Sequence, residues 1–167
     1  MPEALIGLGA NLGDARATIG RAVDIFCDGA QVRLLTRSSD YCTPPWGDTD
    51  QPPFINAAIA VATALTPRAL LDRALATEKR LGRDRHTQRR WGQRAIDIDL
   101  LAYDDLILDE PGLVLPHPRL LERAFVLIPL AEIRPDWIVS GMRVGEAARM
   151  ADARGIERLA AAENSAN

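Results

Sequence analysis

Two aspartates separated by one residue are the strongest candidates for chemistry in this sequence. Asp97 and Asp99 alternate with the apolar residues Ile96 and Ile98. In a strand, side chains two positions apart project from the same face, with roughly 7 Å between their Cα atoms. Two carboxylates supply part of the octahedral shell of Mg²⁺, which water and phosphate oxygens usually complete. The spacing therefore indicates a magnesium site for a phosphate-bearing substrate.

A concentrated positive charge precedes this pair. Seven of the 20 basic residues of the chain lie between residues 79 and 94, against a single acid, Asp84. Guanidinium groups match phosphate oxygens bidentately, and Glu78 adds a third carboxylate just before the segment. The chain has no Gly-x-x-x-x-Gly-Lys-Ser/Thr sequence, so we expect arginines to bind phosphate. The basic residues are Lys79, Arg80, Arg83, Arg85, Arg89, Arg90 and Arg94.

Other interpretations of these residues stay open on the sequence alone. The aspartates also fit the solvated face of a strand, and the arginines fit a nucleic-acid contact in which Trp91 stacks on a base. His117, in a stiff Pro-His-Pro segment, either points at a phosphate or only ends a strand. The N-terminal glycines miss the dinucleotide-binding spacing, and glycines of this kind are more often turn residues. They are Gly7, Gly9 and Gly13.

The elements that must position these residues alternate between strand and helix. Asp14 and Thr66 are expected to begin the two helices as N-caps, and Gly82 to end the second. The resulting β-α-β-β-α-β order suits a ferredoxin-like α+β sandwich with C-terminal additions. The additions are a hairpin of 106–108 with 113–115, a helical segment over 120–133 and a helix from residue 147 onward. The expected strands are 4–9, 32–41, 55–65 and 95–103, and the expected helices are 14–26 and 66–81.

Length and composition predict one domain. A chain of 167 residues with 47% hydrophobic residues can build one buried core, so we expect residues 1–160 to form a single catalytic domain and 161–167 a frayed tail. No apolar stretch is long enough to cross a bilayer, and the N-terminus lacks a signal-type run. A net charge of −3 argues against a protein that coats nucleic acid. We therefore expect a cytoplasmic monomer with no membrane or nucleic-acid partner, whose cysteines, Cys27 and Cys42, stay reduced.

Several motifs in this sequence resemble one enzyme family. The run from Arg90 to Leu101 resembles the signature of the 6-hydroxymethyl-7,8-dihydropterin pyrophosphokinases. The resemblance spans about residues 5 to 135, and departures such as Ala10 for serine, Gln93 for proline and Phe54 for tyrosine remove no charge. Other matching segments, in the order of the family, are Gly9–Gly13, Thr43–Gly47, Gln51–Asn56, Glu78 with Gly82-Arg83, and Pro116–Pro118 with Arg123–Phe125.

The resemblance implies a reaction and a site. It implies transfer of diphosphate from ATP to the hydroxymethyl group of the pterin, with release of AMP, in tetrahydrofolate biosynthesis. It implies two Mg²⁺ ions held by Asp97 and Asp99, and catalytic roles for these aspartates with Arg83 and Arg94. ATP would be bound by Glu78, Arg83, Arg85, Arg90, Arg94, Ile96, His117 and Arg123. The pterin would be bound by Thr43, Pro44, Trp46, Phe54, Asn56, Asp97 and Phe125.

The chemistry of a pterin agrees with three of these positions. A flat heterocycle with a donor and acceptor edge needs aromatic faces and a polar group beside that edge. Phe54, Phe125 and Asn56 meet this need, although the phenylalanines also fit a core and the asparagine a turn cap. Two rival functions remain, a ferredoxin-like domain that binds nucleic acid and a non-catalytic sensor of pterin or nucleotide.

Overall fold

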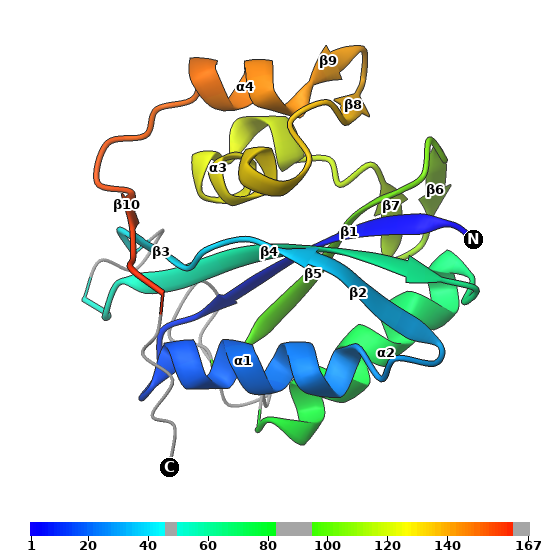
Figure 1. The fold of residues 1–167 in the computed structure, drawn as a ribbon, viewed down its shortest axis with the longest axis horizontal. Coiled ribbons are helices and arrows are strands. Elements are labelled where there is room, and N and C mark those ends of the chain that lie inside the picture. The colour runs from blue at the N-terminus through cyan, green and yellow to red at the C-terminus, as the bar shows by residue number, and fades with distance from the viewer. Residues whose placement is uncertain (46–49, 83–94, 162–167) are drawn as a thin grey trace.

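The centre of the molecule is an antiparallel sheet of six strands (Figure 1). The structure is a computed structural model, and it describes residues 1–45, 50–82 and 95–161. Strand β2 (Val32–Arg37) pairs with β4 beside the main path of the sheet. Along that path the strands are β10 (Glu157–Arg158), β3 (Tyr41–Thr43), β4 (Phe54–Thr63), β1 (Glu3–Ala10) and β5 (Asp97–Tyr103).

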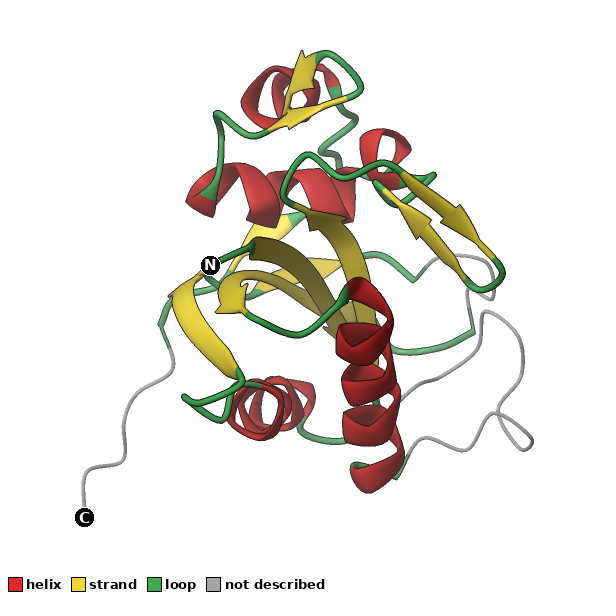
Figure 2. Cartoon of the chain, turned by 90° about the vertical axis from the view of Figure 1, so that its right-hand side faces the viewer, coloured by secondary structure: helices red, strands yellow, loops and turns green. Residues whose placement is uncertain are grey.

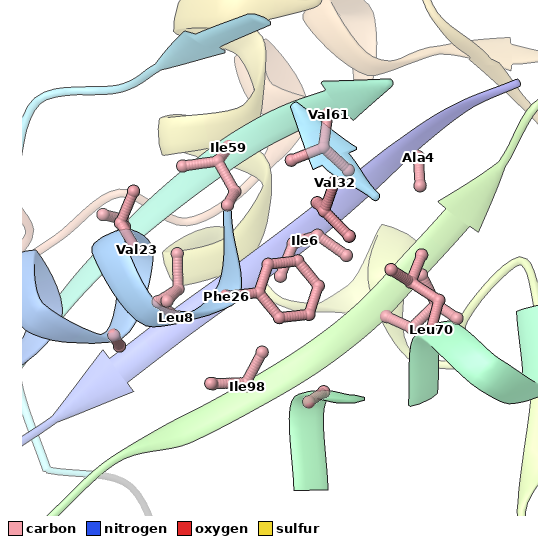
Figure 3. Packing of buried hydrophobic residues seen from close by; sticks show 14 of the residues in the cluster. Ala4, Ile6, Leu8, Val23, Phe26, Val32, Ile59, Val61, Leu70 and Ile98 are labelled. Carbon is pink, nitrogen blue, oxygen red and sulfur yellow. The ribbon is translucent and has the colours of Figure 1, made fainter. Parts of the chain in front are cut away.

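Helices α1 (Ala15–Phe26) and α2 (Pro67–Arg80) cover one face of the sheet (Figure 1). Both begin as expected, because the Asp14 side chain accepts a hydrogen bond from the Ala17 N–H and the Thr66 side chain accepts one from the Ala69 N–H, each at 3.2 Å. Their apolar sides pack on alternate strand residues, and Figure 3 shows Phe26 among Ile6, Leu8, Val32, Leu70 and Ile98.

This packing decides which way the aspartates of β5 point. Ile98 and Leu100 belong to the core under α1 and α2, whereas Leu101 belongs to the core on the opposite face. Since successive side chains of a strand alternate between faces, Asp97 and Asp99 project to the side of Leu101.

Helix α3 (Ala124–Ile133) covers that opposite face, and α4 (Val144–Met150) packs on the outer side of α3 (Figures 1 and 2). A 3₁₀ turn, η1 (Leu120–Glu122), precedes α3. Leu5, Leu101, Leu127 and Leu130 form much of the core on this side. Two short hairpins complete the described chain: β6 (Leu108–Glu110) with β7 (Leu113–Leu115), and β8 (Ile138–Val139) with β9 (Met142–Arg143).

The expected strand over 32–41 is wrong in its continuity. It is interrupted between β2 and β3, where the Ser38 hydroxyl accepts a hydrogen bond from the Ala58 N–H at 2.9 Å. Asp40 there accepts bonds from Arg16 and Arg37, each at 2.9 Å. The Ser38 hydroxyl thus takes the Ala58 N–H of β4 in place of a strand carbonyl, which explains the break.

The C-terminal expectations also need correction. The helical segment over 120–133 is divided at Arg123, whose backbone is extended (φ −108°, ψ 103°). The expected helix from residue 147 onward starts earlier, at Val144, and ends at Met150, and residues 157–158 form a strand on β3. The hairpin uses 108–110 rather than 106–108. Alanine and alternating charge favour a helix locally, but pairing with the distant edge of β3 prevails.

Candidate functional site

Asp97 and Asp99 line one pocket on the α3 side of the sheet. Both side chains are partly exposed, and their backbone partners on β1 are Gly9 and Gly7. Carboxylate oxygens are the donors that Mg²⁺ prefers, so the pair fits a magnesium ion in the open part of the pocket. Within the described ranges 1–45, 50–82 and 95–161, no group of three or more acids, histidines or cysteines is arranged to hold a metal. Glu78 therefore does not complete a cluster with these two residues.

The pocket exists because the strands of the sheet carry small residues at this point. Gly7 and Gly9 on β1 and Ala58 on β4 line its floor. Further along the same face, Leu5 and Leu101 fill the space against α3. A change from large to small residues along one face thus leaves room for a ligand between the sheet and α3.

A fixed amide lies at one side of the pocket. Asn56 donates a hydrogen bond from Nδ2 to the Thr43 hydroxyl at 2.7 Å, and both residues are buried. A Cβ added at Gly9 would lie 2.7 Å from Asn56 Oδ1, so the amide carbonyl lies directly over the glycine. An amide held in this way can recognise the polar edge of a flat ring.

Aromatic and apolar side chains supply the walls. Phe54, at the start of β4, and Phe125, in the first turn of α3, both line the pocket with Pro44. Phe125 also packs against the core under α3, as the alternative interpretation of this residue expects. The Arg123 guanidinium carbon lies 5.7 Å from the Phe125 ring centre, a cation–π distance.

Buried polar groups join the end of β1 to the segment before Phe54. Asn11 donates from Nδ2 to Gln51 Oε1 at 2.8 Å and to the Pro52 carbonyl at 3.1 Å. Asn11 and Gln51 are 3% and 7% exposed, so these bonds are shielded from water. They fix how the chain enters β4 and so where Phe54 stands.

His117 lies near Asp97 but is not among the pocket-lining residues. The backbone N–H of His117 donates to the Leu101 carbonyl at 2.8 Å, and the imidazole Nδ1 accepts from the Arg119 backbone N–H at 3.2 Å. Burial and the nearby charge of Arg123 lower the pKa of His117, against the opposing charge of Asp97. The imidazole is therefore held in the neutral form near pH 7.

The remaining expected residues divide into two groups. Glu78 and Ile96 are buried, at 2% and 0% exposure, and Ile96 belongs to the core under α1 and α2. Their side chains therefore do not line the pocket, and contact between Ile96 and a nucleotide would have to use its backbone. Trp46, Arg83, Arg85, Arg90 and Arg94 lie outside the described residues.

Several pocket residues escaped the sequence reasoning. Gly7 and Gly9 lie in β1, as the expected strand over 4–9 predicts, and Gly13 alone of the three has positive φ, at 55°. The signal that identifies them is their alternation on a buried strand, which exposes bare backbone on one face. The other missed lining residues are Leu8, Ala57, Ala58 and Val126.

The fold and this pocket define a class of protein: a mixed α and β domain with a carboxylate-lined binding site between an antiparallel sheet and a covering helix. The chain belongs to the 7,8-dihydro-6-hydroxymethylpterin-pyrophosphokinase (HPPK) family, whose model matches residues 5–135.

Curated relatives agree over nearly the whole chain. A 2-amino-4-hydroxy-6-hydroxymethyldihydropteridine pyrophosphokinase from Methylorubrum extorquens is 51% identical over 95% of this chain and 99% of its own length. The enzyme of the same name from Pseudomonas aeruginosa is 40% identical over 92% of this chain and 94% of its own length.

Solved structures share the fold at low identity. The HPPK-DHPS of Plasmodium falciparum with pteroate superposes with a TM-score of 0.70 and 12% identity, covering 89% of this chain. An HPPK-DHPS in complex with substrates gives a TM-score of 0.69 and 13% identity over 89% of this chain. The chain spans 44% and 43% of these fused chains, so the likeness concerns one part of each.

Proposed function

We propose that this chain transfers diphosphate from ATP to 6-hydroxymethyl-7,8-dihydropterin, giving AMP and the pterin diphosphate, in tetrahydrofolate biosynthesis. The observation that carries the proposal is the pocket, in which two carboxylates, a fixed amide and two aromatic rings share one cavity. The pyrophosphokinases that are similar over nearly the whole chain support it.

In this proposal the pterin ring lies between Phe54 and Phe125, and Asn56 bonds its polar edge. Thr43 holds the Asn56 amide at 2.7 Å, and Pro44 forms the adjoining wall. Offset stacking on two rings contributes contact area, whereas the amide contributes orientation. Trp46 completes this set by the family resemblance, and Asp97 faces the hydroxymethyl group.

The phosphate side of the reaction needs charge neutralisation and in-line geometry more than covalent chemistry. Asp97 and Asp99 would hold two Mg²⁺ ions, which neutralise the phosphate oxygens when bound. Arg123 lines the pocket next to them and would meet ATP together with His117. By resemblance, Arg83 and Arg94 would act on the migrating group, and Arg85, Arg90 and Ile96 would bind the nucleotide.

We also propose the finer features of the whole protein. The sheet order, in which β1 lies between β4 and β5 with two helices on one face, supports a ferredoxin-like topology. Residues 1–160 would form one catalytic domain, because Leu159 and Ala160 still bond the body of the protein through Asp40 and Arg16. The free thiols of Cys27 and Cys42 support a reducing, cytoplasmic location. No helix in the described part of the chain is long and apolar enough to cross a membrane.

The test is to mix the purified chain with ATP, Mg²⁺ and 6-hydroxymethyl-7,8-dihydropterin and to follow nucleotides and pterins by chromatography. We expect AMP and pterin diphosphate in equal amounts, and no reaction when a chelator removes Mg²⁺. Release of ADP instead of AMP, or no turnover, would reject the function. Size-exclusion chromatography of the same sample tests the proposed monomer.

A further inference from the structure

A C-terminal segment, residues 152–158, runs along the outer edge of β3 (Figure 1). Its strand β10 pairs Glu157 with Cys42 and Arg158 with Tyr41, and the Leu159 N–H that follows donates to the Asp40 carbonyl at 2.9 Å. β3 leads directly into Thr43 and Pro44, which line the pocket. The segment is therefore one strand away from the pocket wall.

Gly155 brings this segment into direct contact with that wall. A Cβ added at Gly155 would lie 2.7 Å from Pro44 Cγ and 3.4 Å from Pro44 Cδ. Real Cβ atoms do not approach another carbon at 2.7 Å, so the glycine backbone is packed against the proline ring with no space for a methyl group. The glycine also has φ +81°, a conformation that favours glycine.

A hydrogen-bonded cluster fixes the other end of β3 to α3 and to β10. Glu132 of α3 accepts bonds from the Ser39 N–H at 2.9 Å, the Ser39 hydroxyl at 2.8 Å and the Tyr41 hydroxyl at 2.9 Å. Arg158 donates to Glu132 Oε1 and to the Ser39 hydroxyl, both at 3.0 Å. The cluster holds β3 against β10, so the segment cannot move without moving the strand that carries Thr43.

We infer that residues 152–158 position the heterocycle pocket, with Gly155 setting the place of Pro44 through direct packing. The inference rests on the proposed function, because it concerns the pterin side of that site. A planar ring held between apolar walls depends on their separation, since dispersion contacts weaken within a fraction of an ångström. Gly155 is a positioning residue, because it acts on the ligand only through Pro44.

The test compares Gly155→Ala with Gly141→Ala. Gly141 has φ +80° and nothing within 4 Å of an added Cβ, so alanine there imposes the same backbone strain without the contact. We expect Gly155→Ala to raise the KM for the pterin about tenfold and to leave kcat and the KM for ATP within about twofold. Both variants should lower the melting temperature, because both place alanine at positive φ. Gly141→Ala should leave all three kinetic constants near the wild-type values.

A second variant separates displacement of Pro44 from general loosening of the chain. In the double variant Pro44→Ala with Gly155→Ala, the methyl group occupies space that the proline ring has left. The fold increase in its pterin KM should lie well below the product of the fold increases of the two single variants. Equal pterin KM values for the two glycine variants, or fully multiplicative effects in the double variant, would overturn the inference.

The outcome stays distinct from that of the proposed function. An absence of AMP formation by the wild-type chain counts against the proposed reaction. Calorimetric titration with the pterin still compares the dissociation constants of Gly155→Ala and Gly141→Ala in that case. Equal dissociation constants for these variants, or no binding to any of the chains, would reject the positioning role.

Discussion

Asp97 and Asp99 are accessible from the pocket because the neighbouring residues on β1 are small and because their own strand directs both side chains to the same face. Their partners across the ladder are Gly9 and Gly7, so no side chain from β1 stands between the carboxylates and the pocket floor. On the other face of β5, Ile98 and Leu100 are anchored in the core, which fixes the direction of both acids. The site is thus determined residue by residue through strand alternation.

Asp97→Asn tests the role of the carboxylates at this scale. The amide keeps the size of the side chain but removes the charge that a magnesium ion needs, so turnover should fall by roughly 100-fold or more. Thermal unfolding should change little, because the side chain is partly exposed. Asp105→Asn, at an exposed position just after β5, is the matched control and should keep full activity. Equal activity of both variants would show that Asp97 is only a solvated residue of the strand, without a role in turnover.

The two glycines of the pocket floor give a graded prediction. A Cβ at Gly9 would lie 2.7 Å from Asn56 Oδ1, whereas a Cβ at Gly7 would meet Leu101 at an ordinary 3.4 Å. Gly9→Ala should therefore displace the amide and raise the KM for the pterin by about tenfold, and Gly7→Ala should raise it much less. Steady-state kinetics with varied pterin at saturating ATP measures the difference. A larger effect at Gly7 would show that the Asn56 amide does not read the ring.

At the scale of elements, the parts with local signals were predictable. The helices α1 and α2 begin at Asp14 and Thr66 because each side chain bonds an N–H three residues ahead, a signal contained in a few adjacent residues. The strand β5 was predictable from its alternation of Ile and Asp. Thr43, Phe54, Asn56 and Phe125 came from the family resemblance, and the structure places them in one pocket with the aspartates.

The elements that depend on distant partners could not be predicted in the same way. The strand β10 has two residues, Glu157 and Arg158, and exists through its pairing with β3 more than 110 positions earlier in the chain. The expected strand over 4–9 contained Gly7 and Gly9, but the pocket floor that they form was missed, because it exists only where β4 and β5 pair with β1 at either side. Nonlocal pairing, rather than propensity, decided both cases.

The cluster around Glu132 predicts how acid affects the junction of α3, β3 and β10. Burial opposes its ionisation, but hydrogen bonds from Ser39 and Tyr41 and the charge of Arg158 together lower the pKa of Glu132 below its usual value of 4.5. A lowered folded-state pKa stabilises the protein above the unfolded pKa, and this contribution is lost as the pH falls through the folded value.

Glu132→Gln should therefore lower the free energy of unfolding at pH 7 and remove part of the loss of stability that the wild type shows below pH 4.5. Urea unfolding at pH 7 and at several pH values below 4.5 measures both effects. Glu157→Gln, at an exposed position on β10, is the control and should reproduce the wild-type pH profile. Parallel profiles for wild type and Glu132→Gln would exclude this carboxylate as a source of the acid sensitivity.

At the scale of the whole molecule, the two faces of the sheet have different tasks. The face under α1 and α2 is closed by an apolar core around Ile6, Phe26 and Leu70. The face under α3 is closed only in part. The core fills one end of it, and the pocket stays open where the strands carry small residues. One closed face lends rigidity to a sheet whose other face must admit substrates.

The position of β1 between β4 and β5 also dictates when the protein can fold during its synthesis. Both hydrogen-bonding edges of this first strand are completed by strands made much later, β4 over residues 54–63 and β5 over residues 97–103. At about 5–20 residues per second, a ribosome needs roughly 5–20 s to advance from the first strand to the last of these. Ribosome-bound chains that expose residues 1–81 should be cut rapidly by protease, and chains that expose residues 1–161 should resist. Protection of the shorter chains would show that β1 does not wait for β5. The strand that forms the pocket floor is thus translated first and secured last, so its backbone N–H and C=O groups stay without their strand partners until β4 and β5 have been made.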